Sequence, residues 1–249
     1  MNVPSPKPLI IGHRGASMYA PENTLAAFNL AYQQGADGIE LDAKLTVDGE
    51  VVVIHDQTLE RTTGVPGKVI EKTLAQLKAL DAGSHFSNQF QGEQIPTLEE
   101  VFVQLGGKLL INVELTSYAS PGDMLPEKVA QLVKKHGIEE RILFSSFHPV
   151  ILTRIKRLLP GVPAALLTGE GFLGFIGRSY FGRMVSPEAI HPFFPYATRT
   201  FIDREHERRR KVNVWTVNSA DDMQRLINDN VDGIITDDPI TALRVRGVS

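Results

Sequence analysis

The sequence predicts an α/β fold in which eight parallel strands alternate with helices and close into a (β/α)8 barrel. Three observations carry this prediction. The chain has 249 residues, a length that such barrels routinely use for one domain. Short apolar runs rich in β-branched residues recur along it, and helix signals lie between most of them. No glycine-rich or Walker-type nucleotide motif favours an open doubly wound sheet instead.

The expected strands follow one another at intervals filled by helical patterns. Capping boxes begin at Thr73, Thr97 and Ser219, while Gly35 and Gly137 stand where helices should stop. Such alternation is typical of a parallel sheet covered by helices. The strand candidates are Pro8–Gly12, Gly38–Asp42, Val51–His55, Leu109–Leu115, Ile142–Ser145, Ala164–Thr168, Ala189–His191, Val212–Val217 and Gly233–Thr236.

One interval is too short for a helix. Only eight residues separate the second strand candidate from the third, whereas a parallel crossover needs a dozen or more. An Asp-Gly pair at 48–49 is a strong hairpin signal. We therefore expect Ile39–Thr46 to pair antiparallel with Val51–Asp56, with Asp42 opposite His55. The remaining eight candidates are left to form the parallel barrel.

The stretch 57–108 is too long for an ordinary loop and contains helix and turn signals of its own. We interpret it as a small subdomain inserted at the barrel mouth, after the second strand and its hairpin. No internal repeat, low-complexity tract or linker is evident, so residues 1–249 are expected to form a single domain.

Composition excludes several classes of protein. Lys and Arg number 26 against 29 Asp and Glu, which argues against a dedicated nucleic-acid surface. The absence of cysteine excludes disulfides, thiolate metal sites and a cysteine nucleophile. We see no signal peptide and no apolar run of about 18 residues that would predict a transmembrane helix. These features are compatible with a reducing cytosol, and we expect a cytoplasmic protein.

Three acidic side chains are expected to meet where the strands end. Glu40 and Asp42 project from the same face of one strand, and Glu114 lies on the next parallel strand. Carboxylates side by side in a barrel repel one another and are costly to desolvate, and a divalent cation removes both penalties. An all-oxygen set suits Mg²⁺ or Ca²⁺, with Mn²⁺ also possible. Ion pairs with nearby basic side chains are the alternative.

Two histidines and an arginine flank the expected acidic cluster. His13 follows the first strand, and His55 ends the hairpin. Histidine changes charge near neutral pH, so one ring can take a proton while the other gives one. The planar fork of Arg14 suits phosphate oxygens. The combination predicts metal-assisted phosphodiester cleavage, although each histidine taken alone is more often a structural residue.

Several motifs, in order along residues 9 to 239, resemble those of the glycerophosphodiester phosphodiesterase family. The resemblance implies a TIM-type barrel with a small inserted subdomain. It also implies hydrolysis of glycerophosphodiesters, small-molecule substrates, to sn-glycerol 3-phosphate and an alcohol. The matching motifs are Gly12–Gly15, Pro21–Thr24, Ile39–Asp42, Asp48-Gly49, His55-Asp56, Arg61–Thr63, Pro96–Val101, Asn112–Glu114, Ser145–Phe147, Trp215–Asn218 and Gly233–Pro239.

The resemblance also implies roles for individual residues. His13 and His55 correspond to the acid–base pair, Arg14 to the phosphate contact, and Glu40, Asp42 and Glu114 to the metal ligands. One position departs from the pattern. Many members carry lysine two residues after the third metal-ligand glutamate, and this chain has Thr116. We expect weaker neutralisation of the phosphate charge, or compensation by a cation from elsewhere.

Three further residues at strand ends are candidates for substrate binding. His148 either lines the pocket or caps the following helix. Trp215 is expected to form an apolar wall for the glycerol or the leaving group. Asp237 either orients a histidine or a glycerol hydroxyl, or caps the last helix.

An apolar, glycine-rich stretch at 171–177 is followed by arginines and aromatic residues up to 183. It is interpreted either as a helix packed on the barrel, the more common case, or as a segment that makes peripheral contact with a membrane surface. Lysophospholipase D activity on lysophospholipids is therefore an alternative function. A non-catalytic phosphoester-binding barrel is a second alternative. The sequence does not indicate the oligomeric state.

Overall fold

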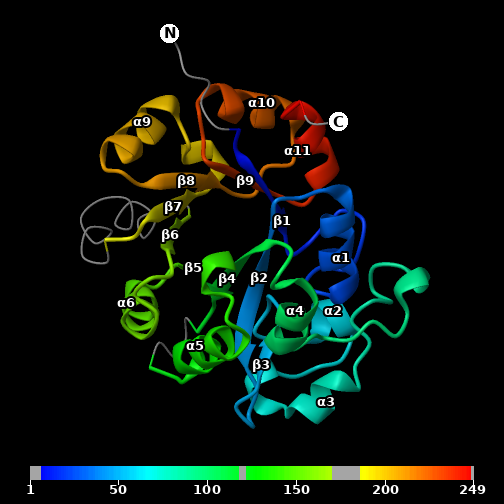
Figure 1. The fold of residues 1–249 in the computed structure, drawn as a ribbon. Coiled ribbons are helices and arrows are strands. Elements are labelled where there is room, and N and C mark those ends of the chain that lie inside the picture. Colours follow the sequence, from blue (N-terminus) through cyan, green and yellow to red (C-terminus); the bar gives the residue numbers. More distant parts are fainter. Residues whose placement is uncertain (1–6, 118–121, 170–185, 248–249) are drawn as a thin grey trace.

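A computed structural model describes residues 7–117, 122–169 and 186–247, and it confirms the barrel. Eight parallel strands close on themselves, because β1 pairs with β2 on one side and with β9 on the other (Figure 1). Around the barrel the strands are β1 (Leu9–His13), β2 (Gly38–Leu45), β4 (Leu110–Leu115), β5 (Ile142–Ser146), β6 (Ala164–Thr168), β7 (Ala189–Pro192), β8 (Lys211–Val214) and β9 (Gly233–Thr236).

Helices surround the strands, and their ends carry the signals seen in the sequence. Thr97 forms a full capping box, Ser219 accepts a backbone hydrogen bond as an N-cap, and Gly35 and Gly137 end their helices in the left-handed conformation. The outer helices are α1 (Leu25–Gln34), α4 (Leu98–Leu105), α5 (Leu125–His136), α6 (Pro149–Leu158), α9 (Arg199–Glu207), α10 (Ala220–Asn228) and α11 (Pro239–Val245), with short 3-10 turns η3 (Glu139–Arg141) and η4 (Phe194–Tyr196).

The core lies between the barrel wall and these helices. On α4, for example, Leu98, Val101, Phe102 and Leu105 are all buried against the strands, at the spacing of one helix face. Burying each such side chain stabilises the fold by about 1.5–3 kcal/mol before the entropic cost of ordering it. The packed wall holds the strand ends, and hence the charged side chains there, at fixed positions.

The predicted hairpin is present, but its register differs by one residue. β3 (Val51–Val53) pairs antiparallel with β2, and Ala43 stands opposite Val53. The N–H of Ile54 donates to the carbonyl of Asp42 at 3.0 Å. Ile54, and not His55, therefore lies opposite Asp42, so the prediction for that pair was wrong.

The turn explains the shift. The prediction assumed a two-residue turn at 48–49, whereas the observed turn has three residues: the N–H of Thr46 donates to the carbonyl of Glu50 at 3.0 Å. Gly49 takes the left-handed conformation at φ 78°, as such a turn requires. β3 ends before His55, and the loop after the strand positions this histidine.

The hairpin lengthens the barrel wall at the carboxyl end of β2. β1 pairs with residues 38–40 of β2, and β3 pairs with residues 43–45. The carboxyl half of β2 thus continues past the end of β1. This extension brings the inserted segment next to the barrel mouth.

The segment 57–108 contains two packing units. One contains α2 (Glu60–Thr63), η1 (Val69–Glu71), α3 (Leu74–Lys78) and η2 (Asn88–Phe90). The other is α4, which packs in the main core. A small separate core joins the first unit to β3 and consists of Val52, Ile54, Leu59, Val69, Leu77, Ala82 and Ile95.

Candidate active site

Glu40, Asp42 and Glu114 meet on one face of the neighbouring strands β2 and β4. The sheet register places Asp42 beside Glu114, and Glu40 lies two residues earlier on the same face. One carboxylate oxygen from each residue lies within 4.8 Å of the other two. Glu40 and Asp42 are buried, and Glu114 is partly buried. The structure therefore brings together the three acids that the sequence singled out.

The three carboxylates fit a divalent cation. Burial raises the pKa of Glu40 well above its ordinary value, and the charges of Asp42 and Glu114 raise it further. Without a cation, the ionised form of Glu40 is therefore costly and its neutral form is favoured. All of the donor atoms are oxygens, which suits Mg²⁺, Ca²⁺ or Mn²⁺ rather than a metal that prefers nitrogen or sulfur.

The turn after β1 presents Arg14 to this cluster. Arg14 itself lies in the left-handed region at φ 55°, which costs a non-glycine residue about 1–3 kcal/mol. Gly15 follows at φ 90°, and a Cβ there would lie 2.6 Å from the backbone of Ala27. Only glycine lets the turn pack this closely against α1. The strained residue, Arg14, is the one whose backbone N–H and side chain both reach the acids.

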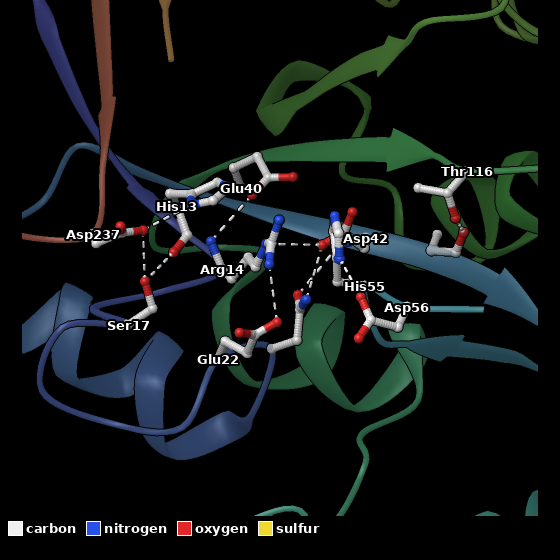
Figure 2. A network of polar contacts seen from close by, with 12 residues as sticks. His13, Arg14, Ser17, Glu22, Glu40, Asp42, His55, Asp56, Thr116 and Asp237 are labelled. Carbon is white, nitrogen blue, oxygen red and sulfur yellow. Dashed lines mark hydrogen bonds and ion pairs between the residues drawn. The ribbon is translucent and has the colours of Figure 1, made fainter. Parts of the chain in front are cut away.

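Arg14 contacts three carboxylates (Figure 2). Its backbone N–H donates to Glu40 Oε2 at 3.1 Å, and its guanidinium donates to Glu22 Oε1 at 3.0 Å. Its Nε lies 3.5 Å from Asp42 Oδ2. Burial lowers the pKa of Arg14, but the charges of Asp42, Glu22 and Glu40 outweigh it and raise the pKa overall. Arg14 therefore remains a cation, and it lies beside the acids that could hold the metal.

His13 is held by Asp237 from the last strand end. The ring Nδ1 lies 2.6 Å from Asp237 Oδ1. Asp237 also accepts hydrogen bonds from Ser17 Oγ at 2.9 Å and from Asn218 Nδ2 at 2.6 Å. Although burial raises the pKa of Asp237, these bonds and the charge of His13 lower it to about 2. An ionised Asp237 favours a proton on Nδ1 of His13 and leaves Nε2 as the ring nitrogen that can accept a proton.

His55 is held by Asp56 from the loop after β3. Its Nδ1 lies 2.7 Å from Asp56 Oδ1, and Asp56 Oδ2 accepts a hydrogen bond from Arg61 Nε at 2.6 Å. The bond from Arg61 is the main reason that the pKa of Asp56 falls to about 2. In Figure 2, His13 and Asp237 lie at one end of the acidic row, and His55 and Asp56 lie beside Asp42. The two histidines therefore flank the cluster.

Glu22 links the two sides of the site, a role that the sequence did not reveal. It accepts hydrogen bonds from Arg61 at 2.6 and 2.8 Å and from Arg14 at 3.0 Å. Burial raises its pKa, but the two arginines lower it to about 2. Glu22 lies in a motif that carried the family resemblance, which was the one available signal.

Asn23, the next residue, secures a metal-site acid. Its Nδ2 donates to Asp42 Oδ2 at 2.9 Å, and the N–H of Asp42 donates to Asn23 Oδ1 at 3.3 Å. The paired bonds fix the orientation of the Asp42 carboxylate. Sequence reasoning missed this contact as well.

For two of the three substrate-binding candidates, local contacts bear on the alternatives that the sequence left open. His148 Nδ1 accepts a hydrogen bond from the N–H of Val150 at 3.2 Å and so caps α6. Asp237 contacts His13, while its neighbour Asp238 caps α11. Asp237 is thus placed to orient a histidine, and the helix-capping alternative applies to the following residue.

Trp215 belongs to an aromatic group at the barrel mouth. Its ring centroid lies 5.6 Å from that of Phe147 and 5.6 Å from that of Phe193. Its Nε1 donates to the carbonyl of His191 at 2.7 Å. Phe147 is 39% exposed. The group offers an apolar wall that faces partly to solvent.

Thr116 has a charged neighbour. Lys44 Nζ donates to Thr116 Oγ1 at 2.7 Å, and both side chains are buried. Burial lowers the pKa of Lys44 below its ordinary value, and the charges of Asp42, Glu114 and Asp56 offset this only in part.

The stretch 171–183, for which membrane contact was predicted, lies outside the described residues. Among the helices of the described ranges, none is long and apolar enough to cross a bilayer.

Comparisons with known proteins agree with this geometry. The sequence model of the glycerophosphoryl diester phosphodiesterase family matches residues 13–241. A glycerophosphodiester phosphodiesterase of Caldanaerobacter subterraneus subsp. tengcongensis is 41% identical over 96% of this chain and 98% of its own. A solved structure of an Oleispira antarctica phosphodiesterase in complex with the product sn-glycerol-3-phosphate is 30% identical, with a TM-score of 0.85 and 96% of each chain covered. A glycerophosphodiester phosphodiesterase structure from Agrobacterium tumefaciens is 29% identical, with a TM-score of 0.83, and covers 95% of this chain and 99% of that one.

Proposed function

Because the chain belongs to the glycerophosphoryl diester phosphodiesterase family, we propose that it hydrolyses glycerophosphodiesters to sn-glycerol 3-phosphate and an alcohol by metal-dependent histidine acid–base catalysis. The chain is an enzyme of the phosphoric diester hydrolase class. One observation carries the finer proposal. Two histidines, each with an aspartate on Nδ1, flank three clustered carboxylates and an arginine.

The charged groups of the site suit a phosphodiester. A divalent cation held by Glu40, Asp42 and Glu114 would stabilise negative charge on the phosphate oxygens. Arg14 lies beside the same cluster and stays protonated. Its guanidinium would bind a phosphate oxygen and orient the phosphorus between the two histidines.

The histidines move the protons. One ring removes a proton from the nucleophile, which is water or a neighbouring glycerol hydroxyl, and the other protonates the oxygen of the leaving alcohol. Asp237 and Asp56 hold Nδ1 of His13 and His55, so Nε2 is the atom that gains or loses the proton on each ring. Both aspartates also stabilise the imidazolium that forms when their partner takes a proton.

The remaining candidates would bind the organic parts of the substrate. Trp215 and its aromatic neighbours form a wall suited to the carbon skeleton of the glycerol or the leaving alcohol. His148 lies at the start of α6 and would reach the same side of the mouth. The product named for the Oleispira antarctica structure supports sn-glycerol 3-phosphate as the product here.

Lysophospholipase D activity remains a second candidate. The exposed ring of Phe147 beside Trp215 could receive an acyl chain. Comparing glycerophosphocholine with lysophosphatidylcholine as substrates separates the two functions. The non-catalytic alternative is set aside, because the relatives that cover nearly the whole chain are named as enzymes.

The decisive experiment measures release of sn-glycerol 3-phosphate from a panel of glycerophosphodiesters, before and after EDTA treatment and after adding back Mg²⁺, Ca²⁺ or Mn²⁺. We expect chelation to abolish activity and one of the cations to restore it. Glu114→Gln should mimic chelation, whereas Glu99→Gln, on the outer helix α4, should not. Full activity in EDTA would reject the metal, and no activity on any diester would reject the substrate class.

A further inference from the structure

We propose that Lys44 is a phosphate-binding residue, which holds the substrate diester and the phosphomonoester product from the side opposite Arg14. The proposal rests on the proposed function and assigns to that site a cation from β2.

Lys44 lies on the same face of β2 as two of the clustered acids. Alternate residues of a strand share one face, so Glu40, Asp42 and Lys44 follow one another at steps of about 6.6 Å. Lys44 is the outermost of the three and is only 6% exposed. Its ammonium therefore lies inside the barrel mouth, farther from the barrel centre than Asp42.

The ammonium has a neutral partner. Thr116 Oγ1 donates its own proton to the carbonyl of Ala43 at 2.8 Å and accepts the bond from Lys44 Nζ at 2.7 Å. Among the residues that the structure describes, no carboxylate lies within 4 Å of Lys44 Nζ. A buried cation without a contacting anion is costly, and an ammonium has three donors to satisfy. The arrangement is suited to an anion that arrives with the substrate.

Lys44 follows Asp42 by two residues on one face of β2, so its ammonium lies on the side of the acidic cluster where a phosphate would bind. In Figure 2, Thr116, the partner of Lys44, lies beyond Asp42 on the side away from His13. Arg14 approaches Asp42 from the turn after β1. A phosphate beside the acidic cluster would therefore have a cation on each side.

This assignment also accounts for the neutral residue at 116. Thr116 lies two residues after Glu114, just beyond the end of β4. Its hydroxyl holds the Lys44 ammonium beside it. Lys44 on the neighbouring strand thus supplies the positive charge that Thr116 lacks. This is the compensating cation that the sequence led us to expect as one of two outcomes.

Lys44→Met tests the proposal, because methionine keeps most of the volume and removes the charge. Loss of one hydrogen bond to a charged group should lower kcat/KM for glycerophosphodiesters by about 10–100-fold. The inhibition constant of sn-glycerol 3-phosphate should rise by a similar factor, while that of neutral glycerol stays unchanged. Lys44→Gln should behave in the same way. Lys135→Met, on the exposed face of α5, is the matched control and should change neither constant.

A double variant makes the test sharper. In Lys44→Met/Thr116→Lys the charge returns from the adjacent strand, and kcat/KM should recover to within about threefold of the wild type. Unchanged inhibition by sn-glycerol 3-phosphate in both Lys44→Met and Lys44→Gln would overturn the proposal. Equal weakening of glycerol and sn-glycerol 3-phosphate would do the same, because it indicates a structural role. An inactive wild type would instead reject the proposed function.

Discussion

The two histidines of the site are held in different ways. His13 is 17% exposed, and its partner Asp237 has two more hydrogen-bond donors from the barrel, Ser17 and Asn218. His55 is 41% exposed, and its partner Asp56 is secured by Arg61, which is itself 46% exposed. The His13 side is part of the barrel, whereas the His55 side depends on ion pairs with the inserted segment.

The difference in exposure predicts that the His13 side of the site is the more rigid. Interactions among partly buried groups are stronger than those that water and salt can screen. We therefore expect the His13 side to tolerate less change, and the His55 side to respond to ionic strength. In the proposed mechanism the two sides are chemically equal, since each would supply one ring for proton transfer.

Removing either ring gives the largest expected effect. His13→Ala and His55→Ala should each lower kcat by about 10²–10⁴-fold, because each deletes a general acid or base. His85→Ala, which removes an exposed histidine of the insertion, is the control and should leave kcat unchanged. Steady-state assays on one glycerophosphodiester decide the matter. Near-normal turnover in either variant would show that the two sides are not equals.

Removing the charge behind each ring should separate the two sides. Asp237→Asn should lower kcat by about 10–100-fold, since it replaces a charged hydrogen bond to a mostly buried ring. Asp56→Asn should cost only about fivefold, because its ring is exposed and the pair is screened. Parallel kcat measurements provide the comparison. Equal losses would show that exposure does not distinguish the two pairs.

Removing the ion pairs between Arg61 of the insertion and the active site should have a smaller effect. Arg61→Gln removes hydrogen bonds to Asp56 and Glu22, and exposed ion pairs of this kind imply a two- to fivefold fall in kcat/KM, on the order of 1 kcal/mol or less. Raising NaCl from low to high concentration should partly reproduce the loss in the wild type. Arg199→Gln, in an exposed pair on α9, is the control. If Arg61→Gln lowered kcat/KM as much as His55→Ala, the ion pairs of Arg61 would do more than position Asp56 and Glu22.

The smallest effect is on stability in acid. The pKa of Asp237 is lowered from its ordinary 3.8 to about 2 by its hydrogen bonds and the charge of His13. Because the folded protein binds this proton less tightly than the unfolded chain, the stabilisation is present above about pH 4 and is lost as the pH falls towards 2. Thermal melts should show Asp237→Asn with a weaker fall in Tm over that interval, a difference of a few degrees. Asp203→Asn, on the outer face of α9, should keep the wild-type slope.

The sequence predicted the barrel and its acidic cluster because both follow from local periodicity. Strand–helix alternation fixes the architecture, and alternation within β2 puts Glu40 and Asp42 on one face. The hairpin register was wrong by one residue because turn length is set by backbone conformation at Gly49, which an Asp-Gly pair does not specify uniquely.

Contacts made by barrel closure could not be predicted in the same way. The sequence suggested that Asp237 could orient a histidine but did not identify which one, because His13 and Asp237 are 224 positions apart and meet only where β1 pairs with β9. The bond between Lys44 and Thr116 and the bridge from Glu22 to Arg61 also join separate segments. No spacing along the chain reports such pairs, since each depends on the packing of whole elements.

The row of charged side chains along β2 limits the insertions and deletions that this chain can accept during evolution. Because successive side chains point to opposite sides of a strand, adding or deleting one codon within residues 40–44 would turn the charged side chains on one side of the change from the lumen to the outer wall. The hairpin tip at residues 47–49 carries no such constraint on direction, so length changes there should survive selection far more often than changes a few positions earlier.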